Sequence, residues 1–197
     1  MELTDEELLA WKPRMGDLTV ADKILQAETL KRQANLRFKR GELKRALAVY
    51  AKVFAYVNGL SVAGDAMAQY ASGSVNLCAT PEEGAEIEAL KVAVWSNMAF
   101  CHVKLGTNPD KALEFCDKVL ALDSKHSKAQ FRKAQALAQL SHFDRSLELL
   151  RELLEVDAKD AAVRGEVRRV QQLKREYDAA AKEKEKSAFG NIFNDKR

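Results

Sequence analysis

Five polar residues of this chain have side chains that donate hydrogen bonds, and their spacing would allow them to form one binding site. They are Lys31, Asn35, Asn97, Lys128 and Arg132. The lysines and the arginine are cations that accept no hydrogen bond, and the asparagine amides also donate. A group of donors without an acidic member suits a ligand with more than one carboxylate. The C-terminal aspartate of another polypeptide is such a ligand, because its main-chain carboxylate lies beside its side-chain carboxylate.

The elements that would position these residues are helices. Residues four apart lie on one face of a helix, so Lys31 and Asn35 would project together, as would Lys128 and Arg132. Asn97 falls on an equivalent helix between them. If these helices belong to stacked repeats, the five side chains line one concave wall.

Three stretches, at residues 42–50, 109–116 and 143–150, carry the same pattern of small and apolar residues. In each, a small residue precedes a leucine, and further apolar or soft residues follow three and six positions later, as in an amphipathic helix. The small residues are Ala46, Ala112 and Ser146, the leucines are Leu47, Leu113 and Leu147, and the residues that follow are Tyr50, Val53, Cys116, Val119, Leu150 and Leu153. The small residue would let a neighbouring helix approach closely.

The distance between these stretches indicates repeats. Ser146 follows Ala112 by 34 residues, which is the tetratricopeptide period. Ala112 follows Ala46 by 66 residues, which we interpret as one repeat boundary that carries an insertion at residues 59–80. A degenerate fourth repeat in that segment is the alternative. Each stretch is preceded by a second predicted helix with its own small residue, namely Ala34, Ala99 and Ala134.

Helix-start and helix-stop signals agree with this spacing. Residues 80–83, Thr-Pro-Glu-Glu, form a capping box with proline at the first helical position. Asn108 followed by Pro109 predicts another helix start, and Gly41 predicts a break between the first two repeat helices.

The residues around the five donors resemble the two-carboxylate clamp of tetratricopeptide co-chaperones. The resemblance rests on residues 30–35, 95–97 and 127–132. It implies binding of the Glu-Glu-Val-Asp tail of heat shock protein 90 or heat shock protein 70. In the implied arrangement, Lys31, Asn35, Asn97 and Lys128 hold the terminal aspartate. Arg132 would reach an upstream glutamate or a main-chain oxygen.

The resemblance also implies three accessory contacts, by Lys104, Phe38 and Phe131. A solvated lysine and two core aromatic residues are the competing interpretation. Within the family, the chain is most similar to the C-terminal half of the large FKBP-type immunophilins and of aryl-hydrocarbon-receptor-interacting protein, over about residues 17–193. The lead-in at residues 17–23, the insertion and a long last helix that ends on residues 189–193 carry this similarity. Those proteins have a prolyl-isomerase domain before the repeats, whereas only about twenty residues precede them here, so isomerase activity is not expected to carry over.

We therefore predict an all-α tetratricopeptide superhelix of three helix-turn-helix repeats with a long C-terminal capping helix. The predicted parts are an N-terminal extension at 1–20 with a short helix near Thr4, Glu7 and Trp11, a repeat region at 21–160, and a capping helix at 161–193 before a tail at 194–197. The repeats are expected at about 22–58, 81–122 and 124–157, with the insertion at 59–80.

Composition restricts the function classes further. The formal net charge of +3 is too small to imply nucleic acid. No apolar run reaches the roughly 18 residues of a membrane span. The acidic first residues do not resemble a signal peptide, and three cysteines without metal spacing favour a reducing, cytoplasmic location. We expect Cys101 and Cys116 to be small core residues, and we expect no metal or cofactor.

The C-terminal region and the absence of catalytic motifs leave rival hypotheses open. Residues 161–197 contain ten Lys+Arg and six Asp+Glu. We interpret this region as a cap on the last repeat; contact with calmodulin or an anionic membrane is the alternative. Phe189, Ile192 and Phe193 form a small apolar cluster near its end. One rival function is a scaffold that uses the insertion or the basic helix for an unrelated partner, and another is a subunit of an isomerase or phosphatase assembly. Since no catalytic constellation is found, we do not expect an enzyme.

Overall fold

The chain is all-α, as predicted, and it divides into two compact units. The computed structural model describes residues 3–62 and 78–194. The units are Met1–Asn108 and Pro109–Arg197, so the two helices of the predicted second repeat fall in different units.

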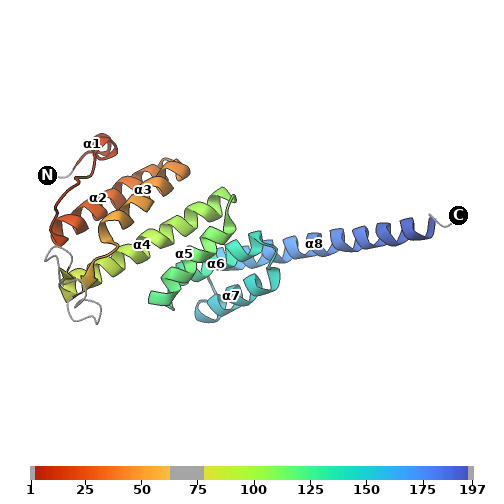
Figure 1. Cartoon of the computed structure of the whole chain (residues 1–197). Coiled ribbons are helices and arrows are strands. Elements are labelled where there is room, and N and C mark those ends of the chain that lie inside the picture. The colour runs from red at the N-terminus through yellow and green to blue at the C-terminus, as the bar shows by residue number, and fades with distance from the viewer. Residues whose placement is uncertain (1–2, 63–77, 195–197) are drawn as a thin grey trace. The chain divides into compact units, whose positions relative to one another are not determined.

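The first unit contains four helices and a minimal pair of strands within its described residues. The helices are labelled in Figure 1. The elements are α1 (Asp5–Ala10), α2 (Val20–Lys39), α3 (Leu43–Val57), β1 (Ser61–Val62), β2 (Cys78–Ala79) and α4 (Pro81–Leu105). β1 pairs with β2 in parallel where the chain enters and leaves the predicted insertion. Two residues per strand are too few to show the alternation of side chains by which a strand is predicted from sequence. Residues 63–77 of the insertion lie outside the described residues.

Capping boxes start three helices of the first unit. The side chains of Thr4, Thr19 and Thr80 each accept a hydrogen bond from a backbone N–H three residues later. An acidic side chain at that third position accepts from the cap backbone in return, which satisfies two otherwise unpaired donors. The boxes at Thr4 and Thr80 confirm the predicted helix starts, and Pro81 is the first residue of α4 as expected.

The core of the first unit forms where α2 and α3 pack on each other and on α4. Small residues allow this close approach, since Ala34, Ala46 and Ala99 are completely buried. The rings of Phe54 and Trp95 stack at 5.4 Å between α3 and α4.

Each secondary-structure element among the described residues of the second unit is a helix. The helices are α5 (Pro109–Leu122), α6 (Ser127–Gln139), α7 (Phe143–Val156) and α8 (Ala161–Asn194). Leu150 and Val170 are completely buried in a core shared by α6, α7 and α8. Cys116 is buried in α5 and Cys101 in α4, which confirms the prediction that both are core residues.

The last helix, α8, packs on α7 and α6 through its first half. The Tyr177 ring meets Phe143 edge-on at 5.6 Å, and side chains from Asp178 to Ser187 are exposed. The side chains of the predicted apolar cluster, Phe189, Ile192 and Phe193, are not among the described side chains. Residues 195–197 of the predicted tail also lie outside the described residues.

The turns inside the two complete hairpins use a backbone angle that L-residues rarely adopt. Gly41, between α2 and α3, has φ +76°, which confirms the predicted break. Ser141, at the equivalent place between α6 and α7, has φ +62° without the freedom of glycine.

Candidate functional site

Two asparagines predicted for the site meet in the first unit, although they lie 62 residues apart in the sequence. Asn97 Nδ2 on α4 donates to Asn35 Oδ1 on α2 over 3.1 Å. The hydroxyl of Tyr50 on α3 donates to the same oxygen over 2.5 Å. Both asparagines are half-buried, whereas Tyr50 is completely buried. Asn35 therefore joins three helices through one oxygen atom.

Lys31 lies one helical turn before Asn35 on α2 and is also half-buried. Its Nζ is 3.9 Å from Glu28 Oε1, and the Glu28 side chain is 53% exposed. This distance is too long for a hydrogen bond, and exposed ion pairs contribute little. The ammonium group of Lys31 is therefore not neutralised by a tight partner.

The two accessory residues predicted in the first unit, Phe38 and Lys104, both contact the ring of Phe100. The Phe38 ring lies 5.4 Å from the Phe100 ring, and Lys104 Nζ lies 5.5 Å from the Phe100 centroid. Phe38 is half-buried and Lys104 is exposed near the C-terminal end of α4, where a cation is favourable. The ammonium of Lys104 can thus remain over an aromatic face while it contacts solvent.

The other predicted residues lie on α6 in the second unit. Lys128 is exposed and forms no ion pair with any described residue, and Arg132, one turn later, is half-buried. Phe131 is half-buried and packs on the core of α6, α7 and α8, so in this structure it serves that core. Lys128 and Arg132 share a face of one helix, as the spacing predicts.

The start of α6, beside Lys128, is capped by a histidine. His126 Nδ1 accepts a hydrogen bond from the Ala129 backbone N–H over 3.1 Å. The ring must be unprotonated at Nδ1 to do so. This cap sets the first turn of the helix, on which Lys128 lies.

The charge of Arg132 also acts on the interior of its unit. Burial raises the pKa of the Cys116 thiol to about 12, although Arg132 acts to lower it. A thiol with such a pKa is not a nucleophile at neutral pH, because the thiolate is the reactive form.

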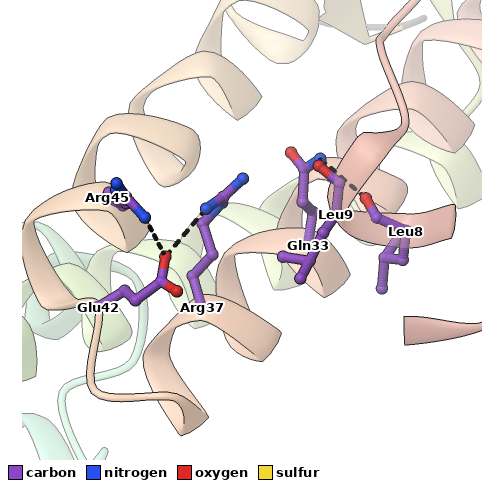
Figure 2. Close-up of polar contacts among 6 residues, drawn as sticks. All are labelled: Leu8, Leu9, Gln33, Arg37, Glu42 and Arg45. Atoms are coloured by element: carbon purple, nitrogen blue, oxygen red, sulfur yellow. Dashed lines mark hydrogen bonds and ion pairs between the residues drawn. The ribbon is translucent and has the colours of Figure 1, made fainter. Parts of the chain in front are cut away.

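Sequence reasoning missed a set of buried polar residues that hold the N-terminal segment. Gln33 Nε2 donates to the carbonyl oxygens of Leu8 and Leu9 over 2.8 and 3.1 Å (Figure 2). It also donates to the carbonyl oxygen of Trp11 over 3.1 Å. Gln26 Oε1 accepts from the Arg14 backbone N–H over 2.8 Å. The sequence signal that could have indicated this contact is the pair Gln26 and Gln33, seven residues apart on a helix face distinct from that of Lys31 and Asn35.

Figure 2 also shows a charged cluster at the turn between α2 and α3. Glu42 Oε2 accepts from Arg37 over 3.0 Å and from Arg45 over 3.4 Å. Burial raises the pKa of the Glu42 carboxyl, but the bonds from Arg45 and Arg37 outweigh it, so the pKa lies below its usual value. This cluster closes the first hairpin and is separate from the predicted site residues.

The described residues contain no group of three or more His, Cys, Asp or Glu side chains that could hold a metal ion. None of the helices in the described ranges is both long and apolar enough to cross a membrane.

Comparison with known families and sequences shows what the chain is similar to. Residues 107–166 match the family described as tetratricopeptide repeat. Peptidyl-prolyl cis-trans isomerase FKBP4 of Mus musculus is 28% identical over 177 residues, which is 90% of this chain and 34% of that protein. The chain thus spans about a third of the length of the curated relatives it matches.

Solved structures with the same fold include the following three. The C-terminal TPR-containing domain of an FK506-binding protein from Plasmodium falciparum has TM-score 0.66 and 16% identity, covering 83% of this chain and 97% of that one. The Hsp90 co-chaperone Cns1 from Saccharomyces cerevisiae has TM-score 0.61 and 18% identity, covering 86% and 46%. The second TPR domain of human RPAP3, in complex with the HSP70 peptide SGPTIEEVD, has TM-score 0.53 and 18% identity, covering 76% and 98%. At these identities, the likeness establishes the fold alone.

Proposed function

We propose that this tetratricopeptide repeat chain, which is homologous to the repeat region of FKBP4, is a protein-binding co-chaperone adaptor. Its ligand is the C-terminal Glu-Glu-Val-Asp tail of heat shock protein 90, heat shock protein 70 or both. The observation that carries the proposal is the joined pair of Asn35 and Asn97 beside Lys31. The human RPAP3 domain, which shares the fold, is described with a peptide that ends in this sequence.

The first unit supplies neutral donors and one cation to this proposed site. Asn35 Nδ2 donates to no other described residue, so it is available to a ligand oxygen. Lys31, one turn away, would add a charge-assisted bond to the same carboxylate, and such bonds are stronger than neutral ones. Glu28 offers it only a long ion pair, which a ligand carboxylate can replace.

The second unit would supply the remaining cations. Lys128 is exposed and would bind the terminal aspartate, and Arg132 would bind an upstream glutamate or main-chain oxygen. Phe38, Lys104 and Phe131 are the proposed accessory contacts. Charge-assisted bonds contribute roughly 1.5–3 kcal/mol each. After the ordering of a short peptide is subtracted, about 7–8 kcal/mol remains, which corresponds to micromolar affinity.

Titration calorimetry with a Glu-Glu-Val-Asp peptide tests the proposal. Lys128→Ala should weaken binding by about ten-fold or more, because it removes a charge-assisted bond. Lys125→Ala is the matched control, since Lys125 is exposed just before the same helix and its side chain bonds none of the described residues, while its backbone N–H donates to Asp123. A peptide with an amidated C-terminus should bind much more weakly. Equal affinity for the free and amidated peptides would refute the proposed function.

The alternative is a scaffold that uses the insertion or the C-terminal helix for an unrelated partner. Exposure of the α8 side chains from Asp178 to Ser187 favours it. This stretch has three lysines and three acidic residues, a balance that does not favour calmodulin or an anionic membrane as the partner. A pull-down from cytosol that recovers partners but no heat shock protein would support the scaffold.

We also propose that the chain acts without catalysis and in the cytoplasm. The isomerase activity in the name of FKBP4 belongs to a relative of which this chain matches 34%. Assay of the purified chain for prolyl isomerisation should give the uncatalysed rate.

A further inference from the structure

We infer that Tyr50 is a positioning residue of the proposed carboxylate site, which holds the Asn35 amide so that its NH2 group faces the ligand. The inference rests on the proposed function and adds a specificity determinant to it. Tyr50 is not one of the five donors, since it lies on α3 and is completely buried.

The length of the hydrogen bond indicates its direction. The Tyr50 hydroxyl oxygen and Asn35 Oδ1 are 2.5 Å apart. Hydrogen bonds between two oxygens extend down to about 2.5 Å, whereas bonds from an amide nitrogen begin at about 2.7 Å. The short contact therefore places the amide oxygen of Asn35, rather than its nitrogen, against the tyrosine.

The second donor reinforces this orientation. Asn97 Nδ2 donates to the same Asn35 oxygen over 3.1 Å. A carbonyl oxygen has two lone pairs, so Tyr50 and Asn97 together saturate it. The NH2 group of Asn35 is then directed away from both donors, and it donates to no other described residue. A ligand at this position meets only a donor, which selects a carboxylate.

Tyr50 is suited to this role because its hydroxyl cannot turn to solvent. A buried tyrosine hydroxyl requires a partner, and Asn35 provides it. Without the hydroxyl, the Asn35 and Asn97 amides can exchange donor and acceptor roles by both turning over. In the turned-over arrangement, the Asn35 amide oxygen faces the ligand carboxylate and repels it.

Tyr50→Phe removes the hydroxyl alone, and Tyr56→Phe is the matched control. Tyr56 lies on the same helix, is buried, and donates to the Arg14 carbonyl oxygen over 2.9 Å, away from the proposed site. Both variants should lose comparable thermal stability. Only Tyr50→Phe should weaken binding of the free-carboxylate peptide, by about five- to ten-fold, and reduce the preference for the free over the amidated peptide.

Two further variants separate positioning from a general loss of structure. Asn35→Asp keeps an oxygen that accepts from Tyr50 and Asn97, so the protein should remain folded, but the second oxygen replaces the donor and peptide binding should fall more than ten-fold. In an Asn35→Ala background, Tyr50→Phe should cause no additional loss of affinity. A Tyr50→Phe variant that keeps the wild-type free-to-amidated ratio would overturn the inference.

A measurement without ligand distinguishes failure of the inference from failure of the proposed function. In a nuclear magnetic resonance spectrum of ¹⁵N-labelled protein, the Asn35 side-chain NH2 should give one pair of signals in the wild type and in Tyr56→Phe. The pair should broaden or double in Tyr50→Phe. If it stays single and sharp, the inference is wrong whatever the peptide does. If it changes but the wild type binds no peptide, the positioning holds and the proposed ligand is wrong.

Discussion

The two units of the chain differ in the kind of contact that stabilises each of them internally. In the first unit, buried polar side chains connect separate elements: Gln33 bonds the N-terminal segment, Tyr56 bonds Arg14, and Tyr50 bonds Asn35. In the second unit, the core around Leu150 and Val170 is mostly apolar, although the buried Ser146 hydroxyl donates to the Ala134 carbonyl oxygen over 2.7 Å. Hydrogen bonds are directional and apolar packing is not, so the first unit is suited to fixing neutral groups that must point one way.

This difference matches the residues that each unit would bring to a ligand. The asparagines of the first unit have short side chains and an amide that can face either way, so bonded neighbours must orient them. Lys128 and Arg132 of the second unit have long, flexible cationic side chains that donate in any rotation. For them, placement of the helix is sufficient.

Truncation of the apolar core should give the largest effect and tests how strongly apolar packing stabilises the second unit. Leu150→Ala should lower the free energy of unfolding by about 2–5 kcal/mol, because it leaves a cavity where the side chain was completely buried. Urea unfolding followed by circular dichroism measures it. Leu122→Ala, at a side chain that is 46% exposed, is the control. A cost similar to that of the control would contradict the role given to this core.

Loss of a buried side-chain amide in the first unit should destabilise mainly the N-terminal segment. Gln33→Ala leaves the carbonyls of Leu8, Leu9 and Trp11 without their donor and should cost about 1–3 kcal/mol. We expect faster hydrogen exchange in residues 3–18 and a changed Trp11 fluorescence. Arg32→Ala, at an exposed neighbour, should change neither. Unchanged exchange in Gln33→Ala would show that α1 is held by other contacts.

Giving each hairpin turn the residue found in the other should change the free energy of unfolding by smaller amounts and in opposite directions. Ser141→Gly should stabilise the chain by about 0.5–1 kcal/mol, since it removes the strain of a positive φ at a residue with a Cβ. Gly41→Ser should destabilise it, and the cost is one of backbone conformation because a Cβ at Gly41 would meet no atom within 4 Å. Thermal unfolding of both variants checks the pair. Changes of the same sign would show that the two turns are not equivalent.

The surface ion pairs should contribute least. Hydrogen bonds from Lys111 and Lys118 lower the pKa of Glu114 to about 2. A lowered pKa in the folded state gives stability that is present above about pH 4.5 and is lost as the pH falls toward 2. Because these side chains are 40–52% exposed, Glu114→Gln should cost no more than about 0.5 kcal/mol at pH 7. The difference from wild type should shrink between pH 4.5 and 2. A constant difference would assign the effect to something other than charge.

The helices and their contact faces could be predicted because short sequence patterns determine them. Ala46, Ala112 and Ser146 were predicted from spacing to allow close approach, and all three are completely buried. Thr80 and Pro109 marked helix starts that the structure confirms. Leu47 and Leu113 are only half-buried, although they occupy the same place in the pattern as the buried Leu147.

The hydrogen bonds between elements could not be predicted, because they depend on which rotamers face each other after packing. Tyr50 was recognised as a residue of the apolar stripe, but its hydroxyl partner lies on another helix. Asn35 and Asn97 were expected near each other, whereas their direct bond was not. The function of the five donors as one site remains a prediction, since they belong to two units.

The single oxygen of Asn35 has a mechanical consequence. Any load on that amide is transmitted to α3 through Tyr50 and to α4 through Asn97. Occupancy of the NH2 group should therefore slow hydrogen exchange along the facing turns of all three helices, including turns that no ligand atom touches. The first hairpin, formed by α2 and α3, would become stiffer when a ligand is bound to the Asn35 amide.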